Sequence, residues 1–335
     1  MLLLLLLLLV PLLDSVRGVA IQPPKGPITD HFIDYLNRND LGSMDYARTD
    51  YGTQGSFGGF QSESERNSTK WIGIYPVVFF HGNTDSALQT SDFSTGFSSS
   101  IEYFLIWGYP QYALYVTSWG DNLIMNAKTR HSMGVTLARR VVKGGRVEAS
   151  DGTCFLGGPL TDQVLVFVAL AGCNYGICSC SGESLQLTNP TCNSQAISPY
   201  HATSVCAIDG FWPGDYCVGD TTGRDCSFPH TNDSSSCTTN GMSKYLSDLN
   251  ADTTREAKRY IYSVWSVDDD LICNGDYVFG RLTSLVPGSD GVMTVLNYTH
   301  METKDMTTDS QFDMVMSGSQ ALPLPFPTVD DPGLT

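Results

Sequence analysis

Apolar residues gather into short, nearly unbroken runs that are separated by polar, Gly-rich or Pro-rich stretches. Runs of roughly four to eight such residues, many of them β-branched or aromatic, are typical of strands buried on both faces of a parallel sheet. Strands are therefore predicted at residues 76–80, 112–116, 163–170, 259–266 and 292–297. The run 163–170 has the strongest strand character, which predicts a place at the centre of the sheet.

Between these runs, apolar residues recur at helical spacing. Helices are predicted at 29–39, 99–107 and 133–143. The last of them ends at Lys143-Gly144, since a cation in the final turn and a following glycine favour a helix end. The succession of strand, loop, helix and strand favours a parallel sheet, so the sequence predicts an α/β fold in a single domain.

The first residues predict an export signal. An apolar run from Met1 to Leu13 is too short to span a bilayer comfortably and gives way to polar residues ending at Gly18. We therefore expect a signal peptide over 1–18 and a secreted mature chain over 19–335. Because no later stretch approaches transmembrane length, we expect no stable insertion into a membrane.

Ten cysteines are present, and nine of them lie between Cys154 and Cys237. Export favours disulfide bonds over metal ligation, and the even count allows full pairing. A zinc site would need well-spaced Cys and His pairs, whereas Cys178-Ser179-Cys180 has no matching partner pair. We expect no metal and a disulfide-rich, loop-rich insertion over about 173–252. N-glycosylation sequons, which agree with secretion, begin at Asn67, Asn232 and Asn297.

The negative net charge of the chain indicates which classes of partner are unfavourable. Its formal net charge of -16 argues against nucleic acid and anionic membrane surfaces, because either would repel the protein at long range. A neutral or weakly polar substrate is favoured instead.

One serine stands immediately before the helix predicted at 133–143. Ser132 lies two residues ahead of Gly134, a pattern typical of the sharp strand-to-helix turn that exposes a nucleophilic hydroxyl. Arg130 departs from that pattern, because the turn favours small neighbours. The alternative interpretation is an ordinary helix N-cap, a position at which serine is also favoured.

Polar side chains follow three of the predicted strands. The strand 76–80 runs into His81-Gly82-Asn83, where glycine would let a backbone N–H approach a substrate carbonyl; a plain turn with a buried histidine is the alternative. The strand 259–266 runs into Asp268-Asp269-Asp270, at the strand end where α/β sheets gather site residues; a solvated acidic loop is the alternative. His300 follows the last predicted strand, although a lone histidine there is more often structural.

Five motifs occur in order along the chain: His81-Gly82-Asn83, Trp119-Gly120-Asp121, His131-Ser132-Met133-Gly134-Val135-Thr136, Ala171-Gly172-Cys173-Asn174-Tyr175-Gly176 and Tyr298-Thr299-His300. Together they resemble the class 2 lipases of the α/β-hydrolase superfamily, most closely the secreted nematode members. The resemblance covers about Phe32 to His300. It implies the α/β-hydrolase fold and a serine esterase or triacylglycerol lipase. Such an enzyme uses no cofactor and acts on small-molecule or lipid esters, in the latter case at a lipid–water interface.

The resemblance also assigns roles to residues. Ser132 would be the nucleophile, His300 the general base and then acid, and Asp269 the group that orients the imidazole. Asp268 and Asp270 stay open as substitutes for Asp269. The oxyanion hole would consist of two backbone N–H groups, those of Asn83 and Met133.

One stretch is too short for this fold. A crossover and a new parallel strand would both have to fit between Thr117 and Arg130, and a crossover alone usually needs about a dozen residues. Members of the resembled family carry a helix and a hydrophobic strand at this place. We therefore expect that the crossover helix and the nucleophile strand before Ser132 are deleted, through an exon skipped in splicing or in gene prediction. The chain as written would then fold poorly or lack activity.

The sequence is compatible with three functions. The first is hydrolysis of carboxylic esters, and the second is a secreted relative without catalysis that serves as a binding or structural protein. The third is hydrolysis of another bond, such as an amide or a thioester, because acyl-transfer machinery is shared across these substrates.

Overall fold

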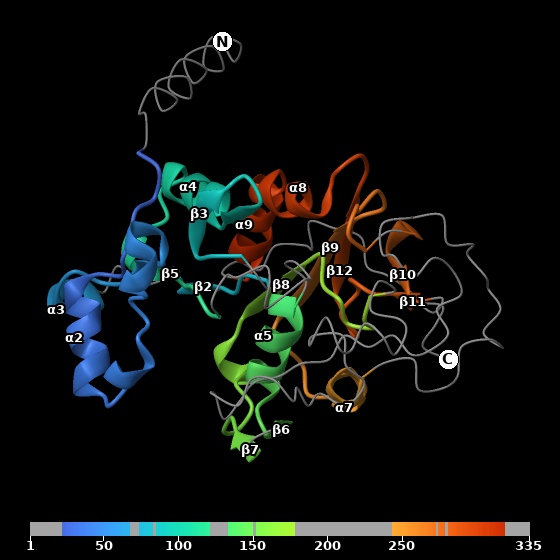
Figure 1. The fold of residues 1–335 in the computed structure, drawn as a ribbon, viewed down its shortest axis with the longest axis horizontal. Helices are drawn as coiled ribbons and strands as arrows, with labels where there is room; N and C mark the ends of the chain where they lie inside the picture. The colour runs from blue at the N-terminus through green and yellow to red at the C-terminus, as the bar shows by residue number, and fades with distance from the viewer. Residues whose placement is uncertain are drawn as a thin grey trace, which may run out of the picture.

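The computed structural model describes residues 22–67, 74–82, 85–120, 133–149, 152–177, 243–272, 274–278 and 281–318 (Figure 1). The helices are α2 (Asp30–Arg38), α3 (Glu63–Arg66), α4 (Ser98–Ile106), α5 (Met133–Lys143), α7 (Lys244–Ala251), α8 (His300–Asp305) and α9 (Thr308–Ser317). The strands are β1 (Ser56–Gly58), β2 (Val77–Phe79), β3 (Leu88–Ser91), β4 (Ser94–Gly96), β5 (Leu114–Thr117), β6 (Arg146–Ala149), β7 (Gly152–Phe155), β8 (Val166–Leu170), β9 (Tyr260–Ser266), β10 (Tyr277–Val278), β11 (Arg281–Leu282) and β12 (Gly291–Val295).

The predicted elements are confirmed to within a few residues at each end. The three predicted helices are α2, α4 and α5, and the five predicted strands are β2, β5, β8, β9 and β12. Their boundaries follow from local chemistry. The Thr29 hydroxyl, for example, accepts a hydrogen bond from the Phe32 N–H and so caps the start of α2.

Two three-stranded sheets form the centre of the described structure. In the order β1-β5-β2, β5 pairs parallel with β2 and antiparallel with β1. In the order β12-β9-β8, all pairs are parallel, with Val168 opposite Tyr262 and Met293 opposite Val264. The predicted parallel pairing is confirmed, but the described strands make two sheets where one was predicted.

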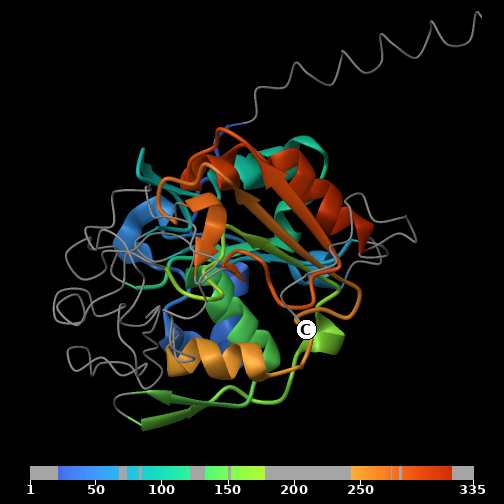
Figure 2. The same cartoon turned by 90° about the vertical axis from the view of Figure 1, so that its right-hand side faces the viewer.

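Helices cover both faces of the sheet β12-β9-β8. On one face, Ala138 of α5 packs in a cluster with Phe167 of β8 and Ile261 of β9. On the other face, Tyr262 and Val264 of β9 pack against Met314 of α9. Figures 1 and 2 show the resulting layers, with α8 and α9 on one side of the strands and α5 and α7 on the other.

Two predictions about burial and position are wrong. Among the described strands, β8, expected at the centre, lies at the edge of its sheet, and β9 is central. Residues 76–80, expected to be buried on both faces, include Val78 with 58% of its surface exposed. The physical reason is that β2, among the described strands, has a neighbour on one edge only.

The cysteine-rich insertion predicted at about 173–252 lies largely outside the described residues. Its last part is not loop but helix α7, which Ser243 caps and which buries Leu246 and Leu249. Cys154 is disulfide-bonded. The predicted signal peptide also lies outside the described residues. Among the helices that are described, none has the length and apolar character needed to cross a membrane.

Candidate active site

Asp269 and His300 meet at the ends of two neighbouring parallel strands. Asp269 follows β9, and His300 is the first residue of α8, which begins after β12. Thr299 caps α8 through a reciprocal pair of hydrogen bonds with Glu302. His300 Nδ1 lies 2.6 Å from Asp269 Oδ2, and both side chains are buried. The contact brings together two of the three residues that the resemblance assigns to a triad.

The Asp269 carboxylate is held in its ionised form. Burial alone would raise its pKa, but the neighbouring His300 and the N–H groups of Leu271 and Ile272 outweigh that effect and lower the pKa. Those N–H groups donate to Oδ1 at 2.9 and 2.7 Å. Because an ionised carboxylate only accepts, His300 Nδ1 must donate to it, which directs the second ring nitrogen to act as a base.

The adjacent aspartates have other partners. Asp268 Oδ2 accepts a hydrogen bond from the Asn297 N–H at 2.7 Å, and Asp270 Oδ1 accepts one from the His300 N–H at 2.9 Å. Both therefore tie the end of β9 to the backbone around His300. Of the three aspartates, Asp269 is the one whose carboxylate contacts the imidazole.

His81 is a buried, neutral histidine with a structural role. Its Nε2 accepts a hydrogen bond from the Trp119 N–H at 2.9 Å, and the Trp119 indole stacks on the ring with 5.3 Å between centroids. Its Nδ1 donates to the Gly82 carbonyl at 2.7 Å. Burial lowers the pKa of His81 to about 4. The Trp119-containing motif thus packs against the loop that begins at His81; Asn83 lies outside the described residues.

The start of α5 lies against that same loop. A Cβ atom on Gly134 would overlap the carbonyl oxygen of His81, so only glycine permits this approach. Met133 is buried, and Ser132 lies outside the described residues. Gly82, Gly134 and His300 all border one cavity. The sequence neighbours of Asn83 and Ser132 therefore border the same cavity as His300.

A family model described as Lipase (class 2) matches residues 75–131 and 128–313, which together make up more than half of the chain. The chain belongs to the class 2 lipase family. It is therefore a hydrolase of the lipase and esterase type. The comparisons with curated proteins and with solved structures found no match.

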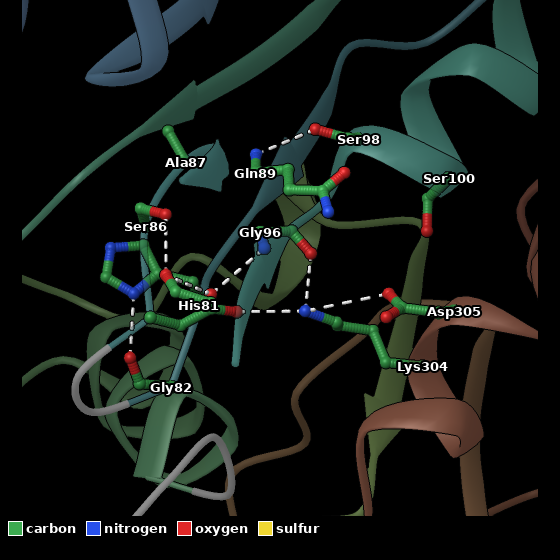
Figure 3. A network of polar contacts seen from close by, with 12 residues as sticks. His81, Gly82, Ser86, Ala87, Gln89, Gly96, Ser98, Ser100, Lys304 and Asp305 are labelled. Carbon is green, nitrogen blue, oxygen red and sulfur yellow. Dashed lines mark hydrogen bonds and ion pairs between the residues drawn. The ribbon is translucent and has the colours of Figure 1, made fainter. Parts of the chain in front are cut away.

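A buried ion pair that was not predicted connects two parts of this class 2 lipase site. Lys304, on α8 one turn after His300, lies 2.9 Å from Asp85, which follows the His81 loop. Figure 3 shows the Lys304 ammonium group pointing toward the Gly96 carbonyl, to which it donates a hydrogen bond. Asp85 also accepts from the Gly96 N–H at 2.9 Å. These contacts hold α8 against the segment after the loop.

A second buried cluster includes Asn174, which belongs to the motif at residues 171–176. Arg139 on α5 donates from Nε to Glu256 Oε1 and from Nη1 to Asn174 Oδ1, both at 2.8 Å. The Asn174 N–H donates to the Thr283 carbonyl at 2.7 Å. This cluster was not predicted from the sequence, because its members come from distant parts of the chain. In the described ranges, no three His, Cys, Asp or Glu side chains gather as a metal site would require.

Proposed function

We propose that this chain is a secreted serine carboxylic ester hydrolase, a triacylglycerol lipase or esterase. The observation that carries the proposal is the buried contact between Asp269 and His300 at the ends of parallel strands, in a chain of the class 2 lipase family. We further propose that Ser132 is the nucleophile that this pair activates.

The chemistry would be acyl transfer in two steps. His300 Nε2 takes the proton of the Ser132 hydroxyl while Oγ attacks the ester carbonyl, and the imidazolium then returns the proton to the leaving alcohol. Water repeats the sequence on the acyl-enzyme and releases the acid. Asp269 keeps the imidazole in the required tautomer and stabilises its charged form.

The oxyanion hole would use the N–H groups of Asn83 and Met133. The close approach of Gly134 to His81 supports this assignment, because it brings the start of α5 to the loop that contains Asn83. Each such donor contributes about 3 kcal/mol to transition-state stabilisation in other hydrolases.

We also propose that the chain as written lacks the crossover helix and the strand that should precede Ser132. The short stretch between Thr117 and Arg130 supports this, and so does the division of the family match at residues 128–131. Without a strand to hold it, Ser132 would be positioned poorly. The alternative function is accordingly a secreted, catalytically impaired relative.

Sequencing the transcript across codons 117–131 and expressing each version found would test both proposals. We expect a longer message whose product reacts with a fluorophosphonate probe, and much weaker reaction of the shorter chain. Ser132→Ala must abolish the labelling. An uninterrupted message that matches this chain, together with robust ester hydrolysis, would refute the deletion. Absence of labelling in every folded version would refute the hydrolase and favour the non-catalytic relative.

A further inference from the structure

Lys304 is a buried cation on α8, one turn after His300. Its ammonium nitrogen lies 2.9 Å from Asp85 Oδ2 and 3.7 Å from Asp305 Oδ1. Figure 3 shows the same group directed at the carbonyl of Gly96, to which it donates a hydrogen bond. Two of these partners precede Lys304 by 219 and 208 residues. The side chain therefore connects α8 to a distant part of the chain.

Asp85 is held as firmly as its cation. Its side chain is fully buried, and Oδ1 accepts hydrogen bonds from Ser94 Oγ at 3.0 Å and from the Gly96 N–H at 2.9 Å. Its own N–H donates to the Gly82 carbonyl at 3.3 Å. Both carboxylate oxygens thus have partners, and the backbone bond closes the chain reversal from Gly82 to Asp85. Asp85 fixes the end of the loop that begins at His81.

The loop and α8 contribute to the same site. Gly82, His300 and Lys304 border one cavity. Asn83, the proposed oxyanion donor of this loop, stands between Gly82 and Asp85 in the sequence. The contact between Asp85 and Lys304 therefore connects the helix of the proposed base to the loop of the proposed donor.

Stability alone does not account for a buried ion pair of this kind. Apolar residues of similar volume often stabilise a protein as well or better, because both charges must leave water to form the pair. The pair does supply geometry, since its hydrogen bonds allow only a narrow range of distances and angles. An oxyanion hole needs such accuracy, with donors about 2.7–3.1 Å from the developing charge.

We propose that Asp85 and Lys304 are positioning residues, which set the oxyanion loop relative to His300 and so stabilise the transition state. They act through the loop and the imidazole, not on the substrate itself. The inference rests on the proposed ester hydrolysis. Because the oxyanion develops only in the transition state, loss of the pair should lower kcat and leave KM nearly unchanged.

The test separates stability from catalysis by a double substitution. Lys304→Met alone leaves the Asp85 carboxylate buried without its cation, whereas Asp85→Asn combined with Lys304→Met removes both charges. We expect the double variant to regain most of the Tm that the single variant loses. Its kcat for p-nitrophenyl butyrate should nevertheless stay at least about tenfold below that of the parent chain, with KM within about threefold. The pH profile should be unchanged, because the net charge of the pair stays zero.

The matched control removes another ion pair from the same molecule. Arg140, in the last turn of α5, lies 3.2 Å from Asp252, and both are partly buried. Arg140→Met combined with Asp252→Asn should leave kcat unchanged. All variants are made in a version of the chain that hydrolyses the ester.

Three results would overturn the inference: a double variant that regains kcat together with Tm, equal losses of kcat in both double variants, or a rise in KM at the parent kcat. If the double variant fails to fold, Lys304→Arg keeps the charge without the geometry of a single nitrogen and must show the same split, and parent kcat in it would overturn the inference. Absence of hydrolysis in every version would refute the proposed function itself, and the inference with it.

Discussion

His81 makes the stability of this protein depend on pH in a way that one substitution can isolate. The imidazole is 1% exposed, accepts from the Trp119 N–H and stacks on the Trp119 indole. Desolvation lowers the pKa of His81 from 6.5 to about 4, so the folded state holds it neutral.

The sign and the size of the effect follow from linkage. Between pH 6.5 and 4 the unfolded chain binds a proton at His81 that the folded protein does not, so stability rises with pH through this window. The stability that the neutral, buried imidazole contributes is fully present above pH 6.5 and is lost as the pH falls to about 4. At about 1.4 kcal/mol per pKa unit, the loss amounts to about 3 kcal/mol.

Urea unfolding at pH 7 and pH 4 measures this difference. His81→Gln should be the less stable protein at pH 7, because it loses the ring stacking, but its stability should fall by about 3 kcal/mol less than that of the parent chain on acidification. His31→Gln, at a partly exposed histidine, controls for the loss of any imidazole. Parallel pH profiles for the parent chain and His81→Gln would refute the reasoning.

Three further predictions concern the site. In the version that reacts with the fluorophosphonate, Asp269→Asn should slow labelling by roughly 10⁴-fold with unchanged circular dichroism, because it loses the charge that fixes the imidazole; labelling within tenfold of the parent would contradict that role. Gly134→Ala should lower Tm and labelling together, since its Cβ would overlap the His81 carbonyl, whereas Gly158→Ala, with open space around it, should leave both unchanged. Equal effects of the two alanines would show that α5 does not pack against the loop as described. Lys304→Met should cost about 3–5 kcal/mol in urea unfolding because it leaves a carboxylate buried without its cation, while Lys258→Met, at an exposed ion pair, should cost less than about 1 kcal/mol. Similar losses for both lysines would argue against the buried pair.

Local patterning predicted the elements and half of the candidate site. Helix α5 and strand β9 could be predicted because the spacing of apolar residues indicates the type of an element and the face that it buries. Asp269 and His300 were found because residues after parallel strands gather at one sheet edge, and because five motifs of the sequence resemble those of the class 2 lipases.

The rest depends on contacts between distant residues. Arg139 lies in the core because Glu256, 117 residues later, neutralises its charge there. The sequence around Arg139 does not indicate that partner. The neutral state of His81 similarly requires Trp119. The exposure of Val78 depends on which strands pair beside β2, which is a property of the whole sheet.

The central claim is that the imidazole held by Asp269 activates Ser132. Its most direct test is to treat the chain, in each version that its transcripts encode, with a fluorophosphonate, digest it with trypsin and locate the adduct by mass spectrometry. We predict one adduct, on the peptide that contains Ser132 and ends at Arg139, and none after His300→Ala. An adduct on another residue, or labelling that survives His300→Ala, would contradict the claim.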